Sequence, residues 1–251
     1  MNKAIFNWSG GKDSSLSLYY LKKDPQWQIK YLMTLVNESY QRISMHGVRV
    51  ELLEQQAESI GIPLYKLLVP EQMTMDVYNR LMKETLEQFK KEDIHWAVFG
   101  DIFLEDLKKY REEQLAKVEI KGHFPIWKKP TFQLAEDFIR LGFQAIIVCV
   151  DGRYLEKSFV GRLLDKDFLK DLPQGVDPCG ENGEYHSFVF DGPLFRQPVN
   201  FKKGDIVYKR SKPVACSPKE SSSLNGFPSV MTQSIDTGCW YCDLLPVDTC
   251  V

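Results

Sequence analysis

The sequence predicts an α/β fold in which a doubly wound parallel sheet of five strands is followed by a smaller C-terminal α+β domain. Short apolar runs alternate with helix-like segments up to Val150, and the chain then becomes more charged and richer in glycine and proline. Parallel strands need long crossover connections, and a helix is the usual crossover. We expect an N-terminal domain at 1–150, a small C-terminal domain at 151–210 and a flexible tail at 211–251.

The expected strands of the parallel sheet are uncharged or nearly so, as strands covered on both faces are. They are AIFNW from Ala4, KYLMTLV from Lys30, PLYKLLV from Pro63, HWAVFG from His95 and FQAIIVCV from Phe143. Helices are expected at 12–21, 47–61 and 74–91, and strands of the second domain at 184–195 and 204–210. In the helix at 47–61, the apolar residues recur three and four positions apart, which is the spacing of one helix face.

Composition limits the classes of protein to consider. The formal net charge of −2 provides no overall basic field, so we expect no nucleic-acid partner. No stretch approaches the roughly 18 apolar residues of a membrane span, and the first twenty residues lack the apolar core of a signal peptide. We therefore expect no membrane partner and a cytoplasmic location, where the six scattered cysteines would stay reduced.

The string SGGKDS, which runs from Ser9 to Ser14, stands between the first expected strand and the first expected helix. Glycines allow a sharp turn there, and the N–H groups at a helix N-terminus favour a bound anion such as phosphate. The expected nucleotide-binding residues are Ser9, Gly10, Gly11, Lys12, Asp13 and Ser14. Lys12 supplies a positive charge, and Asp13 is the candidate magnesium ligand.

The sequence excludes two better-known phosphate-binding loops. A Walker A loop would need glycine and Ser/Thr at the positions that Phe6 and Asp13 occupy, and the G-x-G-x-x-G dinucleotide fingerprint is absent. A plain tight turn with a serine N-cap is the remaining alternative.

Two later segments offer further polar groups. Asp101 follows the fourth expected strand, at the sheet edge where ligands gather, and could bind magnesium or orient the attacking group. It could also be the N-cap of the next helix, and the two roles are compatible. In GENGEYH, Glu181, Glu184 and His186 suit ammonium capture, deprotonation or metal binding, with a solvated hairpin loop as the alternative. If this segment is a strand, Glu184 and His186 share a face and Tyr185 points away.

SGGKDS resembles the signature of the PP-loop ATP pyrophosphatases. SMHGVR at 44–49, the segment 99–115 and the segment 175–193 resemble the diphthine-ammonia ligase family, also called the ATP-binding domain 4 group, in its stand-alone bacterial-type branch. The resemblance implies a HUP-type domain that cleaves ATP to AMP and pyrophosphate, with magnesium. It implies an adenylating C–N ligase that joins ammonia to a carboxylate, borne by a small molecule or by a protein.

With this activity in view, the candidate residues divide into two groups. The expected catalytic residues are Lys12, Asp101, Glu181, Glu184 and His186. The expected substrate contacts are His46, Tyr110, Glu113 and Tyr185. His46 is nearly as well explained as a helix-capping histidine, and Tyr110 and Glu113 would be a solvated helix face without the resemblance. A homo-oligomer is compatible with the sequence, and the identity of the carboxylate stays open.

Three other functions compete with ligation. CWYC, from Cys239 to Cys242, permits a zinc or redox site in the tail, although a single C-x-x-C with scattered partners is weak evidence. If the chain only sensed a nucleotide, the carboxylates of GENGEYH would have no function. Sulfur transfer, as in tRNA-thiolating PP-loop enzymes, would need reactive cysteines near the nucleotide and a basic surface for RNA.

Overall fold

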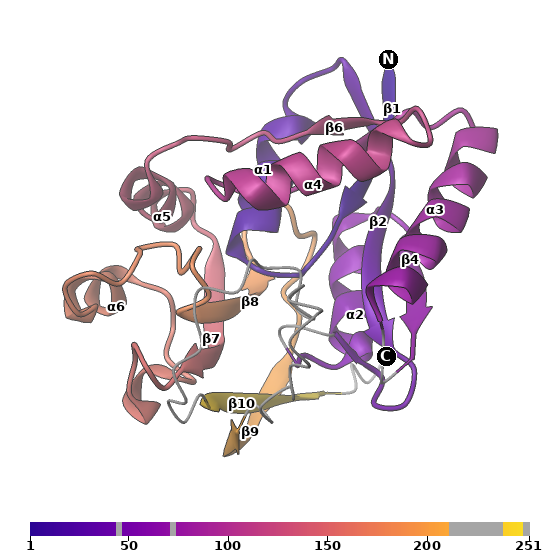
Figure 1. The fold of residues 1–251 in the computed structure, drawn as a ribbon. Coiled ribbons are helices and arrows are strands. Elements are labelled where there is room, and N and C mark those ends of the chain that lie inside the picture. The colour runs from indigo at the N-terminus through magenta and orange to yellow at the C-terminus, as the bar shows by residue number, and fades with distance from the viewer. Residues whose placement is uncertain (44–46, 71–73, 211–237, 248–251) are drawn as a thin grey trace.

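The predicted α/β architecture is confirmed. The computed structural model describes residues 1–43, 47–70, 74–210 and 238–247. A mostly parallel sheet and an antiparallel sheet lie side by side, with helices packed around them (Figure 1). Within these ranges, no helix combines the length and the apolar character needed to cross a membrane.

The first sheet has five parallel strands in the order β4-β2-β1-β5-β6. These strands are β1 (Asn2–Asn7), β2 (Trp27–Asn37), β4 (Leu64–Val69), β5 (Trp96–Val98) and β6 (Lys121–His123), and β3 (Arg42–Ile43) pairs antiparallel with the end of β2. From β1 the chain adds β2 and β4 on one side and then β5 and β6 on the other, so the strand order reverses between β1 and β5. In open α/β sheets a ligand crevice forms at such a point, outside the carboxyl ends of the strands.

Helices cover both faces of this sheet. They are α1 (Lys12–Lys22), α2 (Val50–Ile60), α3 (Met75–Lys91) and α4 (Glu105–Ala116). Because side chains alternate along a strand, Phe6 of β1 packs in one apolar cluster with α1 and α2, whereas its neighbour Ile5 packs in another with α3 and α4. The sheet is therefore doubly wound, as predicted.

One strand of the predicted parallel sheet belongs elsewhere. The run at 143–150 was expected to be its fifth strand, but β7 (Gln144–Asp151) lies in the antiparallel sheet, whose order is β8-β7-β10-β9. It pairs with β8 (Tyr185–Asp191) on one side and with β10 (Gly238–Pro246) on the other, and β10 pairs in turn with β9 (Phe201–Arg210). The fifth parallel strand is β6, whose sequence KGH carries no apolar run that would reveal it.

Part of the predicted tail is also a strand. Gly238–Pro246 forms β10, because its apolar residues fill the space between β9 and β7 and pair with both. Asp243 of β10 accepts hydrogen bonds from Arg42 and Arg49 of the N-terminal half. The rest of 211–251 lies outside the described residues, and the division of the chain into domains stays a prediction.

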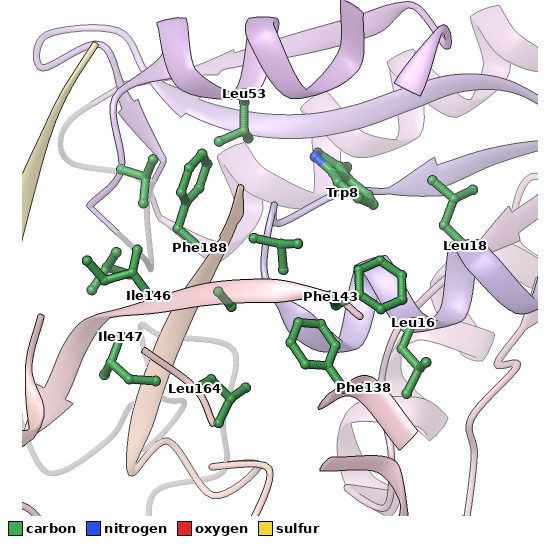
Figure 2. Packing of buried hydrophobic residues seen from close by; sticks show 14 of the residues in the cluster. Trp8, Leu16, Leu18, Leu53, Phe138, Phe143, Ile146, Ile147, Leu164 and Phe188 are labelled. Carbon is green, nitrogen blue, oxygen red and sulfur yellow. The ribbon is translucent and has the colours of Figure 1, made fainter. Parts of the chain in front are cut away.

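A shared apolar core joins the two sheets. Figure 2 shows Phe188 of β8 pointing toward Leu53 of α2, and the rings of Phe138 and Phe143 lying beside Leu16 of α1. The two rings are stacked, with centroids 4.9 Å apart. The remaining helices, α5 (Thr131–Arg140), the 3-10 turn Lys157–Phe159 and α6 (Lys166–Asp171), lie on the side of the antiparallel sheet (Figure 1).

Candidate active site

The SGGKDS loop (Ser9–Ser14) connects β1 to α1 at the carboxyl edge of the parallel sheet. Gly10 has φ +75°, and a Cβ atom there would lie 2.7 Å from Gln56 Oε1. The backbone conformation therefore favours glycine, and a Cβ atom here would also force the Gln56 side chain to shift. The N-cap of α1 is Gly11, which has no side chain with which to cap the helix. The alternative of a turn with a serine N-cap is thus wrong, and no N-cap side chain blocks the approach of an anion to this helix N-terminus.

Two elements that are distant in sequence, α2 and β8, hold the loop through hydrogen bonds. Gln56 of α2 is fully buried, accepts from Trp8 Nε1 at 2.9 Å and donates to the carbonyls of Gly10 and Val189 at 3.0 and 2.5 Å. Val189 N in turn donates to Gly10 O at 2.9 Å, and Ser187 Oγ accepts from Lys12 N at 3.2 Å. The loop therefore pairs with the outer edge of β8, and both sheets contribute to its shape.

The two serines stabilise the turn itself. Their hydroxyl oxygens, Ser9 Oγ and Ser14 Oγ, lie 3.1 Å apart. Ser14 Oγ also donates to the carbonyl of Gly11 at 2.9 Å, and Ser9 Oγ accepts from Gly11 N at 3.3 Å. Each hydroxyl can still rotate toward a phosphate oxygen, because a hydroxyl both donates and accepts.

Lys12 is a buried cation, with a side chain that is 5% exposed. Its Nζ lies 2.7 Å from Asp13 Oδ2 and 5.2 Å from the centre of the Tyr185 ring. Burial opposes the charged form, but the attraction of Asp13, Tyr185 and Cys179 outweighs it and raises the pKa of Lys12. A permanent positive charge therefore stands at the loop, where a phosphate would need one.

The end of β5 faces this loop. A Cβ atom on Gly100 would lie 3.0 Å from Ser14 N, so the two segments are in close contact. Asp101 pairs with Arg111 of α4, with Asp101 Oδ2 2.8 Å from Arg111 Nε and Asp101 Oδ1 3.3 Å from Nη2. The first of these contacts is not aligned as a hydrogen bond. Because α4 begins at Glu105 with Leu104 as its N-cap, the N-cap alternative for Asp101 is wrong.

Glu181 joins the same cluster from the second half of the chain. Its Oε1 accepts from Ile102 N at 2.8 Å. Burial, together with the negative charges of Asp13 and Asp101, raises the pKa of Glu181 to about 8. A carboxyl group of this kind exchanges a proton near neutral pH, which suits a general acid or base.

Glu184 serves a different purpose in the structure. It is 1% exposed, and its oxygens accept from Asp177 N, Asn182 N and Asn182 Nδ2, each at 3.0 Å. Asp177 accepts in the same way from the backbone of Cys179 and Glu181. The segment is therefore an internally bonded turn rather than the solvated loop of the alternative, and Glu184 holds the turn that carries Glu181.

The face of β8 that meets Lys12 is the face of Tyr185. Tyr185 lies against Lys12, and Ser187 bonds the backbone of Lys12, so alternation along the strand directs His186 to the opposite face. Burial, aided by the charge of Lys12, lowers the pKa of His186 to about 4. His186 is therefore neutral at pH 7, and its predicted catalytic role stays a prediction.

The expected substrate contacts are dispersed. Tyr110 is half-buried between α4 and α3 and donates to Asn79 Oδ1. Glu113 is exposed on α4. Tyr185 borders Lys12, whereas His46 lies outside the described residues. The structure thus brings Tyr185 to the loop and leaves Glu113 on the surface.

The CWYC pair does not converge on one point. Cys239 and Cys242 stand three positions apart in β10 and so project from opposite faces of the strand. Among the described residues no group of three or more His, Cys, Asp and Glu side chains could hold a metal ion. Cys216 and Cys250 lie outside the described residues.

Sequence reasoning missed three residues that shape the site: Gln56, Arg111 and Ser187. A signal existed for Gln56, because it is a polar residue within the apolar stripe that contains Leu53, Ala57 and Ile60. A buried polar group needs hydrogen-bond partners, so its presence in such a stripe points to a backbone that it serves. Nothing comparable marked Arg111 in the charged segment around it.

Comparisons with known proteins find similar sequences along most of the chain. Residues 2–121 match the family model described as diphthamide synthase N-terminal domain, and residues 130–219 match the diphthamide synthase C-terminal domain. Proteins named diphthine–ammonia ligase from Bos taurus and Homo sapiens are 27% and 26% identical over 184 residues, covering 67% of this chain and 67% of each relative. A solved structure, a predicted subunit of tRNA methyltransferase from Methanocaldococcus jannaschii, is 18% identical with a TM-score of 0.43, covering 75% of this chain and 96% of that one.

Proposed function

Because the chain belongs to the diphthamide synthase family, we propose that it is an ATP-dependent ligase that forms an amide from a carboxylate and ammonia and releases AMP and pyrophosphate. The observation that carries this proposal is the SGGKDS loop, in which the left-handed Gly10 and a buried, charged Lys12 suit the binding of phosphate. The relatives' names make a diphthine-like carboxylate the first substrate to test.

In the first step the substrate carboxylate attacks the α-phosphorus of ATP. A bond forms between the carboxylate oxygen and this phosphorus, and the bond to the pyrophosphate oxygen breaks. Lys12 and the first-turn amides of α1 stabilise the negative charge that grows on the departing pyrophosphate. Since the loop is held by Gln56 and β8, these groups need little rearrangement during the reaction.

In the second step ammonia attacks the acyl carbon, the C–N bond forms, the bond from this carbon to the AMP oxygen breaks, and the nitrogen loses one further proton to solvent as the amide forms. Ammonium must first lose a proton, because its nitrogen has no lone pair. The ionised form of Glu181 accepts that proton; because the pKa of Glu181 is about 8, this form is a minority at pH 7 and grows as the pH rises. Glu184 keeps Glu181 in place through the bonded turn that both residues share.

Magnesium fits this site as a companion of ATP. Mg²⁺ is usually bound by one or two carboxylates together with phosphate oxygens, so a preassembled protein cage is not required. Asp13 and Asp101, whose charges both act on Glu181, are the oxygen ligands that we assign to it. When bound, the ion would neutralise phosphate charge. We place the enzyme in the cytoplasm, where ATP and reduced thiols coexist.

The test incubates the protein with ATP, magnesium, ammonium and ¹⁸O-labelled carboxylates, and separates the nucleotides. AMP and pyrophosphate in equal amounts, with ¹⁸O transferred to AMP, are expected. Lys12→Ala should reduce AMP formation by about a hundredfold or more, the usual loss when such a stabilising group is removed. Lys22→Ala, on the exposed last turn of α1, is the matched control. ADP as the product, or ATP binding without turnover, would contradict ligation.

A further inference from the structure

A cavity of about 290 Å³ lies between α3 and α4, beside the end of β5. Its floor is apolar, since Leu86, Phe99 and Leu115 are each about 3% exposed. The half-buried rings of Tyr78 and Tyr110 also line it. This volume stands at the lower end of the range for small-molecule sites, so it suits a small organic molecule rather than a folded partner.

The polar groups of the cavity are mostly donors. Asn79 uses its Oδ1 to accept from Tyr110, which leaves the amide N–H groups available. Arg111 has more N–H groups than the two that face Asp101. The exposed cations Arg80, Lys83 and Lys117 complete the rim, and none of the described lining residues is acidic. Such a site favours an anion with an apolar body and disfavours a cation.

Arg111 connects this cavity to the candidate active site. It lines the cavity and pairs with Asp101 through the 2.8 Å contact described above. The residues on either side of Asp101 touch the nucleotide loop and the candidate base: Gly100 packs against Ser14, and Ile102 N donates to Glu181. An acid in the cavity would therefore be next to the strand end that meets the SGGKDS loop.

We propose that the cavity between α3 and α4 binds the body of the carboxylate substrate, a small organic acid with an apolar or aromatic body, and that Arg111 guides its carboxylate toward the nucleotide. This inference rests on the proposed ligase function for the identity of the acid as a substrate. The apolar floor selects for the apolar or aromatic body of the acid, and the hydrogen-bond donors and cations select for its negative charge.

Binding can be measured without turnover by isothermal titration of the whole chain with phenylacetate, 3-phenylpropionate and hexanoate. Their uncharged amides serve as ligand controls. We expect at least one acid to bind, at least tenfold more tightly than its amide. If none of the acids binds, or if acid and amide bind equally, the proposal is wrong.

Two variants test whether the acid binds in this cavity. Asn79→Asp keeps the acceptor for Tyr110 but replaces the amide donors with a negative charge, and Met82→Trp fills the space without changing charge. Each should weaken acid binding at least tenfold and leave the Kd for ATP within twofold. Gln88→Glu adds the same charge to α3 outside the cavity and should change neither. Thermal melting confirms that each variant folds.

The results separate the two proposals. Acid binding that both cavity variants abolish, without AMP formation from any acid, would leave the binding site standing and remove the ligase function. AMP formation whose KM for the acid is unchanged in both variants would leave the ligase standing and remove the cavity. Both Asn79→Asp and Met82→Trp must act for the site to be assigned.

Discussion

Glu181 provides the sharpest test of the electrostatics of the site. Its pKa of about 8, against an ordinary value of 4.5, means that the folded protein holds a proton that the unfolded chain has already lost at pH 7. Stability contributed by this protonated group is therefore complete below the unfolded pKa and declines as the pH rises toward the folded pKa. Glu181→Gln keeps the acceptor for Ile102 N but cannot ionise.

The size of the effect follows from linkage. Each pH unit between the two pKa values costs the wild type about 1.4 kcal/mol relative to Glu181→Gln, or about 3 kcal/mol between roughly pH 5.5 and pH 8. Urea unfolding at these two pH values measures the difference. Glu84→Gln, at an exposed position on α3, is the control and should show no such trend.

The same variant separates the two chemical steps. Glu181→Gln should retain pyrophosphate exchange into ATP, which reports adenylation, and lose amide formation by about a hundredfold or more, the usual contribution of a general base. A stability difference between Glu181→Gln and wild type that stays constant from pH 5.5 to pH 8 would refute the raised pKa. Equal loss of both steps would refute the assignment of the base to ammonia.

Two further predictions concern the framework of the site. Gly10→Ala should lower the free energy of unfolding by about 1–3 kcal/mol, because its φ of +75° and the 2.7 Å approach of Gln56 Oε1 both oppose a Cβ atom; chemical denaturation measures this, and an unchanged midpoint would contradict it. Burial alone would raise the pKa of Asp243, but hydrogen bonds from Arg42 and Arg49 outweigh it and hold this pKa at about 2. Asp243→Asn should therefore cost about 1 kcal/mol at pH 7, allowing for solvent screening, and this difference should vanish as the pH falls from about 4 through 2.

The order of elements was predictable because the local pattern of the first half agrees with its fold. Apolar runs marked four of the five parallel strands, and the periodicity of 47–61 located α2. The strand at 143–150 was recognised as a strand but assigned to the wrong sheet. Periodicity reports whether a segment is buried, whereas the partner of a strand is decided by contacts with residues far away in sequence.

The site shows the same division between local and distant information. SGGKDS is a local signal, because the turn, the anion-binding amides and the cation lie within six residues. The high pKa of Glu181 was not predictable, since it arises from burial in the folded structure together with the charges of Asp13 and Asp101, which are far away in the chain. Likewise β10 follows a long Ser- and Pro-rich segment, and only its pairing with β7 and β9 reveals that it belongs to the fold.

Gln56 is where the two halves of the chain depend on each other most directly. It is fully buried and bonds Trp8 after β1, Gly10 of the loop and Val189 of β8. Gln56→Met preserves the approximate volume but leaves the Trp8 N–H and the Val189 carbonyl without this partner, at a cost of about 2–5 kcal/mol in unfolding free energy.

If the loop shape depends on this residue, Gln56→Met should also weaken ATP binding at least tenfold in titrations at a temperature where the variant is folded. Gln55→Met, on the neighbouring and partly exposed position of α2, should do neither. A destabilised Gln56→Met variant with normal ATP affinity would mean that α1 and β1 alone shape the loop. The contact with β8 would then stabilise the fold without preparing the nucleotide site.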